Sequence, residues 1–454
     1  MGGANIELAA IGKNDNVIMG NPQITFFKSV YKRHTNFSIE SREIINSDSI
    51  NFGSVDAEFT IKNVHHLLTK VYAEVVVSGT SDTSGKYTVN NFGNSLIKEA
   101  SFIMGGKNIE TLYSQWLQIY HELVSPSTQH TPDYYHTSRS DNTGGGKNMD
   151  YDFVTLAKSN TEVRTPLILQ NRINGNTPLV FGAGNHHYKD TAIDTKYYKR
   201  FYVPIPFFFT KNIGLALPLC ALSSEELKIK LTLETKENLI GNVDTLTLES
   251  FKIFGDFVLL ENAERQKFQQ SALTYLIETV HRLDFLTPNT EKNDNELSEK
   301  PFEIDSIKLS VKYICWVVIN SGKEKGRGPC NFASLCDSNE NGNDGFYGKG
   351  SISLNNETKQ EERSMSYYTR YLPQLYCKNK VPEMDRIGIY SFAVDPFNYQ
   401  PSGTCNFNRL SNVEVKLTIA NNNLTTVKNK PIHFYGVNYN ILAINGGISG
   451  LTFT

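Results

Sequence analysis

The sequence predicts an all-β protein built from two tandem β-rich halves. Aromatic residues make up 11% of the 454 residues, with 26 Phe and 23 Tyr, and such side chains favour strands. Short alternating segments recur on both sides of residues 261–271, a polar stretch that favours a helix. The 32 Gly residues predict many turns and loops. We therefore expect two β-sandwiches of jelly-roll type, joined by a helical linker, with few short helices and long surface loops.

The first half carries several strand patterns and one helix pattern. The clearest strand lies in residues 227–234, where apolar and polar side chains alternate without a break, as in a half-buried antiparallel strand. A helix is expected in residues 112–123, because Leu112, Trp116 and Leu123 fall on one helical face. Further strands are expected at residues 59–61, 71–77, 96–104 and 251–260.

The second half shows similar strand patterns after the linker. Its longest alternating pattern spans residues 307–317, which we expect to form one strand. Other strands are expected at residues 275–285, 387–394, 413–419 and 432–442. Long polar stretches without periodicity are typical of functional or mobile loops, and we expect them on the outer surface of an assembly. These stretches are residues 129–157, 171–199 and 320–351.

Residues 20–41 open with a pattern that predicts a short amphipathic helix. Asn21 is a suitable N-cap, and Pro22 suits the first helical position. Ile24, Phe27 and Tyr31 recur at the spacing of one helical face, and basic side chains follow near the C-terminal end. We expect this helix to pack against a larger body. The preceding residues, 1–20, are expected to form an extended arm that orders only against something else.

Charge and hydropathy exclude several classes of protein. The 45 basic and 47 acidic residues give a net charge of -2, which argues against a protein whose main role is to coat nucleic acid. No apolar run approaches the roughly 20 residues that cross a bilayer. The first residues lack the basic region and apolar core of a signal peptide, so we expect synthesis in the cytosol.

The sequence contains no recognisable catalytic, cofactor-binding or metal-binding motif. Residues 144–147 read Gly-Gly-Gly-Lys, but they lack the earlier glycine and the following Ser or Thr of a phosphate loop. The six cysteines form no C-x-x-C pair, which argues against a zinc ribbon. The state of Cys330 and Cys336, in a loop rich in Gly and Asn, stays open. We predict that the protein is not an enzyme and that it uses no cofactor or metal.

Three asparagines lie in the Asn-x-Ser/Thr pattern that accepts N-linked sugar. They are Asn36, Asn356 and Asn423. In a chain made in the cytosol such sequences are normally unused, so these residues are candidate glycosylation sites and no more.

Several segments, taken together, resemble a known family. They include residues 20–28 (GNPQITFFK), 204–209 (PIPFFF) and 261–278 at the linker. Residues 400–407 (QPSGTCNF) and the glycine-ended strand in residues 435–447 continue the series. In kind and in order, these segments are similar to the signatures of the major capsid proteins of nucleocytoplasmic large DNA viruses.

The resemblance implies a double jelly roll in which each half is an eight-stranded jelly roll. It divides the chain into an N-terminal arm with the start of the opening helix (residues 1–24), a first jelly roll (25–262), a helical linker (263–271) and a second jelly roll (272–454).

The resemblance also implies the function of a major capsid protein, a structural virion protein. Its homotrimer would form a pseudo-hexameric capsomer of the icosahedral shell of a large double-stranded DNA virus. The expected partners are neighbouring capsomers, minor capsid and penton proteins, and inner viral membrane proteins, without direct sequence-specific binding of nucleic acid. Assembly would occur in the host cytoplasm, and the protein would end in the virion. The opening helix would lie on the inner face as an assembly element comprising Asn21, Pro22, Phe26, Phe27, Lys28, Tyr31 and Arg33.

Two alternatives remain open at this point. One is a minor capsid paralogue with the same fold. The other is a glycan-binding β-sandwich of the virion surface, in which aromatic loops such as Tyr134-Tyr135 and Tyr197-Tyr198 would hold the sugar. The stoichiometry distinguishes them, because a major capsid protein is the dominant component of the virion.

Overall fold

The computed structural model forms two compact units, Met1–Phe37 and Ser38–Thr454. The described residues are 2–13, 15–46, 49–62, 65–80, 86–87, 92–124, 168–169, 196–239, 246–293, 296–297, 299–319, 328–330, 332, 347–377, 386–420 and 428–453. Most of the three predicted long loops, Cys336, Asn423 and Tyr134-Tyr135 therefore lie outside the described residues. So do the side chains of Tyr197-Tyr198.

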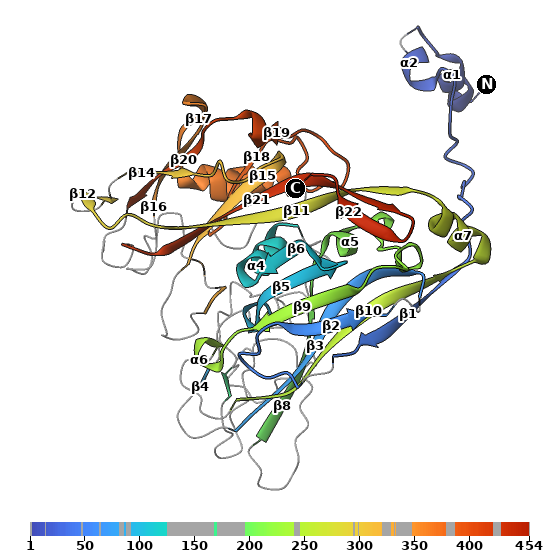
Figure 1. Ribbon diagram of the computed structural model, residues 1–454. Coiled ribbons are helices and arrows are strands. Elements are labelled where there is room, and N and C mark those ends of the chain that lie inside the picture. Colours follow the sequence, from blue (N-terminus) through green and yellow to red (C-terminus); the bar gives the residue numbers. More distant parts are fainter. Residues whose placement is uncertain are drawn as a thin grey trace, which may run out of the picture. The chain divides into compact units, whose positions relative to one another are not determined.

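The first unit contains two short helices instead of the extended arm that the sequence predicted for residues 1–20. Helix α1 spans Gly3–Ala9 and helix α2 spans Asn16–Met19 (Figure 1). Helix α1 has no buried side chain, and Val17 and Ile18 of α2 are 89% and 85% exposed. The prediction of an extended arm was therefore wrong in its backbone conformation.

The predicted opening helix over Asn21, Pro22, Phe26, Phe27, Lys28, Tyr31 and Arg33 is not formed. Asn21 has a φ of 52°, in the left-handed region, and so does not adopt the extended N-cap conformation. The segment is short and rich in aromatic and β-branched side chains, which are weak helix formers in isolation. Its apolar side chains are exposed, so the packing that would stabilise a helix is absent within the first unit.

The first half of the second unit is a sandwich of two four-stranded antiparallel sheets. One sheet has the spatial order β1 (Phe37–Ile44), β10 (Thr247–Leu260), β3 (Leu67–Thr80) and β8 (Lys196–Pro204). The other has the order β2 (Ala57–Ile61), β9 (Leu227–Leu233), β5 (Ile97–Met104) and β6 (Lys107–Tyr113). A small pair, β4 (Lys86–Tyr87) and β7 (Ile168–Leu169), stands apart. The alternation in β9 buries its apolar positions and leaves its polar ones half-buried, as the sequence predicted.

Several short helices pack beside the strands of this sandwich. Helix α4 (Ser114–Leu123) confirms the helix predicted in residues 112–123, and its Trp116 is fully buried. The last two residues of the apolar PIPFFF segment open α5 (Phe208–Lys211), and both Phe208 and Phe209 pack on Phe102 of β5. The other short helices are α3 (Phe92–Leu96), η3 (Ile213–Leu215), η4 (Leu219–Ala221) and α6 (Lys236–Leu239).

Helix α7 (Asn262–Gln270) lies between the two halves of the chain, which confirms a helix in the polar stretch at residues 261–271. It has no buried residue. Every described sheet takes its strands from one side of α7 only (Figure 1). This separation supports the division that we propose, with one jelly roll before residue 262 and another after residue 272.

The second half is a sandwich of two larger antiparallel sheets. One has the order β11 (Leu273–Leu286), β21 (Pro431–Asn445), β15 (Ser310–Val318) and β18 (Gly388–Ser391), with β19 (Cys405–Asn406) on β15 and β22 (Ile448–Leu451) on β21. The other has the order β12 (Glu291–Asn293), β13 (Glu296–Leu297), β20 (Val413–Ala420), β16 (Tyr347–Leu354) and β17 (Glu357–Ser364), with β14 (Lys300–Glu303) on β20. The segment η5 (Tyr367–Tyr371), a π-helix, leads into α8 (Leu372–Tyr376), and η6 (Phe407–Arg409) follows β19.

Strand β15 confirms most of the strand that the sequence predicted at residues 307–317, but it starts later. It begins at Ser310, because Leu309 has a φ of 68° and breaks the extended conformation. Nearly all of its side chains are buried. Trp316 packs with Tyr368 inside the second sandwich, while the partner of Cys315 in β21, Tyr435, contacts Trp116 of the first half. Both faces of β15 are therefore covered, which its alternation alone does not indicate.

A buried histidine makes the stability of the second sandwich depend on pH. His433 is 8% exposed, and burial lowers its pKa below the ordinary value of 6.5, although Asp284 lies 2.6 Å from its Nδ1. In the unfolded chain the His433 imidazole therefore binds a proton at a higher pH than in the folded chain. The free energy of unfolding consequently falls as the pH drops below 6.5. The neighbouring Asp284 has a lowered pKa and titrates below 3.8, outside this range.

We expect His433→Gln to lose less stability than the wild type when the pH falls from about 7.5 to about 5.5. The measurement is the melting temperature at fixed protein concentration at both pH values. His34→Gln, at an exposed histidine, is the matched control and should behave as the wild type. An unchanged pH dependence in His433→Gln would contradict this assignment.

Candidate functional site

The residues that the sequence singled out for assembly form an exposed segment in the first unit. Phe26 and Phe27 are 90% and 99% exposed, and Tyr31 is 85% exposed. Lys28 and Arg33 are exposed as well, as are Asn21 and Pro22. These side chains are thus free to meet a partner, although not as the preformed helix that the sequence predicted.

Two of the candidate glycosylation sites can be placed. Asn36 is exposed in the first unit. Asn356 is exposed in the turn between β16 and β17, with a φ of 66°, and its Oδ1 accepts a hydrogen bond from Asn412 at 3.2 Å. Both positions are exposed to solvent.

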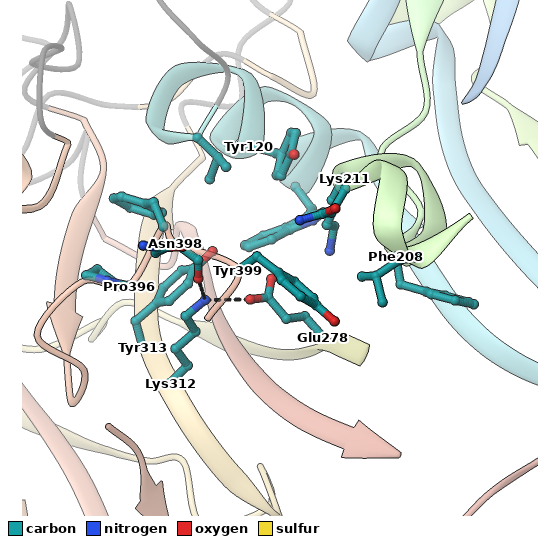
Figure 2. A pocket seen from close by; sticks show the side chains of 14 residues that line it. Tyr120, Phe208, Lys211, Glu278, Lys312, Tyr313, Pro396, Asn398 and Tyr399 are labelled. Atoms are coloured by element: carbon teal, nitrogen blue, oxygen red, sulfur yellow. Dashed lines mark hydrogen bonds and ion pairs between the residues drawn. The ribbon is translucent and has the colours of Figure 1, made fainter. Parts of the chain in front are cut away.

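A pocket lies where the two sandwiches of the second unit meet. Trp116 and Tyr120 reach it from α4, and Phe208 and Lys211 come from α5 of the first half. The second half contributes Glu278 of β11, Lys312 and Tyr313 of β15, and the segment at residues 396–399, so that side chains from distant parts of the chain converge (Figure 2).

A buried lysine organises one wall of this pocket. Lys312 has a side chain that is only 1% exposed, and its Nζ donates to Glu278 Oε1 at 2.5 Å and to the Asn398 carbonyl oxygen at 2.8 Å (Figure 2). The same ammonium lies 5.3 Å from the centre of the Tyr439 ring. A buried charge needs polar or charged partners. By contacting these partners, one cation connects β11, β15, β21 and the segment that precedes the QPSGTCNF motif.

A second ionic contact lies behind Lys211, which lines the pocket from the first half. Glu110 of β6 has a fully buried side chain, and burial raises the pKa of its carboxyl. Lys211 lies 3.5 Å from Glu110 Oε1 and opposes that shift, and the backbone N–H of Phe208 donates to Oε2 at 2.7 Å. The carboxylate therefore fixes the start of α5 against β6, which positions the PIPFFF segment.

Further contacts join the two sandwiches around the pocket. The rings of Trp116 and Tyr435 are 5.4 Å apart, and the Arg282 guanidinium lies 4.5 Å from the centre of the Tyr113 ring. Ser449 Oγ donates to Glu225 Oε2 at 2.5 Å, and the Ser449 N–H donates to Oε1 at 2.9 Å. The two halves therefore form one tightly packed body.

Cys330 also belongs to this junction. Its thiol donates to the Ser114 carbonyl oxygen at 3.3 Å at the start of α4, and burial raises the pKa of the thiol to about 12. Cys330 is not in a disulfide, and it is 2% exposed. It anchors the loop after β15 to the first half as a neutral side chain.

The chemistry of the pocket is that of a structural junction. Lys211 pairs with Glu110 within the first half, and Lys312 pairs with Glu278 within the second half, so each ion pair holds together the elements of its own side of the pocket. Among the residues that the structure describes, no group of three His, Cys, Asp or Glu side chains could hold a metal ion. Within the same residues, no helix is long and apolar enough to span a membrane.

Sequence reasoning missed this junction because its members lie far apart in the chain. Lys312 and Glu278 come from different strands, and Trp116 meets Tyr435 across the two halves. One local signal was available. Lys312 is a charged residue in an otherwise apolar and aromatic strand, and a charge in such a strand indicates a buried ion pair.

Comparison with known proteins identifies relatives along the whole chain. A family model described as the major capsid protein N-terminus matches residues 25–261, and one described as the large eukaryotic DNA virus major capsid protein matches residues 264–450. The major capsid protein of Pyramimonas orientalis virus is 29% identical over 480 aligned residues, and that of Paramecium bursaria Chlorella virus 1 is 27% identical over 496; each alignment covers 100% of both chains.

Solved structures show the same fold. A quasi-atomic model of the PBCV-1 virus capsid aligns with a TM-score of 0.70 and 23% identity, covering 95% of this chain and 100% of the other. The Faustovirus major capsid protein aligns with a TM-score of 0.68 and 11% identity, covering 93% of each chain. These neighbours are double jelly-roll proteins, which confirms the fold class that the sequence predicted.

Proposed function

Because the chain belongs to the family of large eukaryotic DNA virus major capsid proteins, we propose that it forms the icosahedral shell of such a virus as a homotrimer. The observation that carries this proposal is the pair of family models, which together cover residues 25–261 and 264–450 on the two sides of α7. The chain is a structural protein of the virion, and its two sandwiches supply two lobes of a capsomer.

Three copies of a two-lobed chain give six lobes. A pseudo-hexagonal capsomer of this kind can contact neighbouring capsomers on all sides. The body offers apolar side chains for such contacts, since Val55, Ile213 and Val394 are 72%, 74% and 86% exposed, and Leu375 is 61% exposed. Large exposed apolar groups on a folded body are typical of protein interfaces.

The finer partners belong to the same proposal. Minor capsid and penton proteins would bind the capsomer, and inner viral membrane proteins would meet the first unit, with assembly in the host cytoplasm. The exposed residues from Asn21 to Arg33 support this role for the first unit, because they offer apolar and basic side chains to a partner. A structural role accounts for the ionic pairs of the junction pocket without any catalysis.

Electron microscopy of the purified protein tests the proposal. Negatively stained particles should show a six-lobed outline with threefold symmetry, because each chain contributes two similar sandwiches. Two-lobed particles that persist when the protein is prepared well above the usual concentration for such grids would contradict the homotrimer. Quantifying the chain in purified virions separates a major capsid protein, the dominant component, from a minor paralogue.

A further inference from the structure

The segment at residues 24–33 is the most exposed apolar stretch that the structure describes. Ile24, Phe26, Phe27, Val30 and Tyr31 are between 69% and 99% exposed. The hydrogen bonds made by this segment and the adjoining His34 are local, from the Phe27 N–H to Thr25 Oγ1 at 3.3 Å and between His34 Nδ1 and the Thr35 carbonyl oxygen at 2.8 Å. Exposing such apolar side chains to water costs free energy, so we expect a partner surface to cover them.

The charge of the segment indicates the nature of that partner. No acidic residue occurs between Asp15 and Glu40, although the whole chain has a net charge of -2. The same stretch contains Lys28, Lys32 and Arg33, all exposed. A surface that binds it should therefore be anionic.

The order of the residues adds a geometric argument. In a helix successive side chains are about 100° apart. The five apolar side chains would then occupy one arc of about 160°, and the three cations would occupy the opposite arc of about 140°. Thr25 and Ser29 would also fall within the cationic arc. The segment is thus fully amphipathic as a helix, although it is not helical in the structure.

We propose that residues 24–33 fold into an amphipathic helix on an anionic lipid surface. The interface would bury the apolar arc, whose two phenylalanines and tyrosine suit the boundary between headgroups and acyl chains. The cations would attract acidic headgroups. Nucleic acid would account for the cations but not for five apolar side chains on one face. The proposal rests on the proposed function in one respect, namely that the first unit faces the inside of a capsid shell.

Vesicle flotation of the full-length protein tests this inference. Vesicles of phosphatidylcholine with phosphatidylserine should bind the protein about a hundredfold more strongly than vesicles of phosphatidylcholine alone, since each of three cations adds roughly a factor of five. The triple variant Lys28→Glu, Lys32→Glu, Arg33→Glu should lose this preference. The matched control, Lys98→Glu, Lys107→Glu, Lys359→Glu, changes the net charge equally at exposed positions of the body and should keep it.

A second variant separates amphipathic folding from composition. Phe27→Lys combined with Lys28→Phe keeps the composition but places a cation in the apolar arc and an aromatic ring in the cationic arc. It should bind the anionic vesicles at least tenfold more weakly than the wild type. Equal binding of the anionic vesicles by this variant and the wild type would overturn the proposal. So would a wild-type protein that does not bind the vesicles, or that binds an acidic protein instead of the vesicles.

The oligomeric state of the same samples keeps the two claims apart. A trimer that does not bind vesicles would overturn the lipid-binding helix and leave the capsid function intact. A monomer that binds vesicles would support the helix and contradict the homotrimer.

Discussion

Replacing Gly388 by alanine is expected to destabilise the second sandwich by about 3 kcal/mol. Gly388 pairs with Trp316 across β18 and β15, and a Cβ at this position would lie 2.2 Å from Trp316 Cε2 and 2.4 Å from Nε1. The indole cannot move away easily, because it is fully buried and its ring packs against Tyr368 and Phe434. Close-packed interiors do not absorb such an overlap without backbone shifts.

The measurement for Gly388→Ala is thermal melting at fixed protein concentration, where we expect a fall of about 3 °C for a cooperative unit of this size. Gly450→Ala is the matched control, because a Cβ at Gly450, in β22 of the same half, would meet no atom within 4 Å. It should change the melting temperature little. In a Trp316→Leu background the cost of Gly388→Ala should shrink, because the clashing ring is gone. An equal cost in both backgrounds would contradict the explanation.

Removing the charge of Lys312 should destabilise the second sandwich, on its side of the pocket, by about 3 kcal/mol. Lys312→Met keeps most of the aliphatic chain but leaves Glu278, whose side chain is 19% exposed, without its cation. It also leaves the Asn398 carbonyl oxygen without its donor. A carboxylate that has lost its partner in a poorly solvated site accounts for most of the expected cost.

Two comparisons make the Lys312 prediction specific, both by thermal melting at fixed protein concentration. Lys349→Met removes the cation of an exposed pair with Glu362, 3.0 Å long with side chains 61% and 52% exposed, and should cost at most about 0.5 kcal/mol. The double variant Lys312→Met, Glu278→Gln should be more stable than the Lys312 single variant, because no unpaired charge remains. If Lys312→Met cost no more than Lys349→Met, the buried pair would have no structural role.

Local patterns predicted most of the strands because alternation reports which face of a strand is buried. Residues 227–234 and 432–442 each became a strand, and the polar stretch at residues 261–271 became α7. The family resemblance added the double jelly roll, which periodicity alone does not specify. Strand β15 shows what alternation cannot predict: its second face is also buried, because the first half of the chain covers it.

The candidate site was less predictable, for two different reasons. The amphipathic pattern around Phe27 predicts a helix only where a partner buries its apolar face, and within the first unit this face stays exposed. The junction around Lys312 depends on contacts between residues that are distant in sequence. Only the presence of a lysine within a buried, otherwise apolar and aromatic strand marked that place in advance.

The solution mass of the purified protein, by light scattering after size exclusion, tests the central claim most directly. One chain has a mass of 51.1 kDa, so a capsomer of three chains should have a mass of about 153 kDa. We expect this mass at micromolar concentration, unchanged by moderate salt, because an obligate interface of this kind is largely apolar. A stable mass of about 51 kDa under the same conditions would contradict the account of this chain as a self-assembling capsomer.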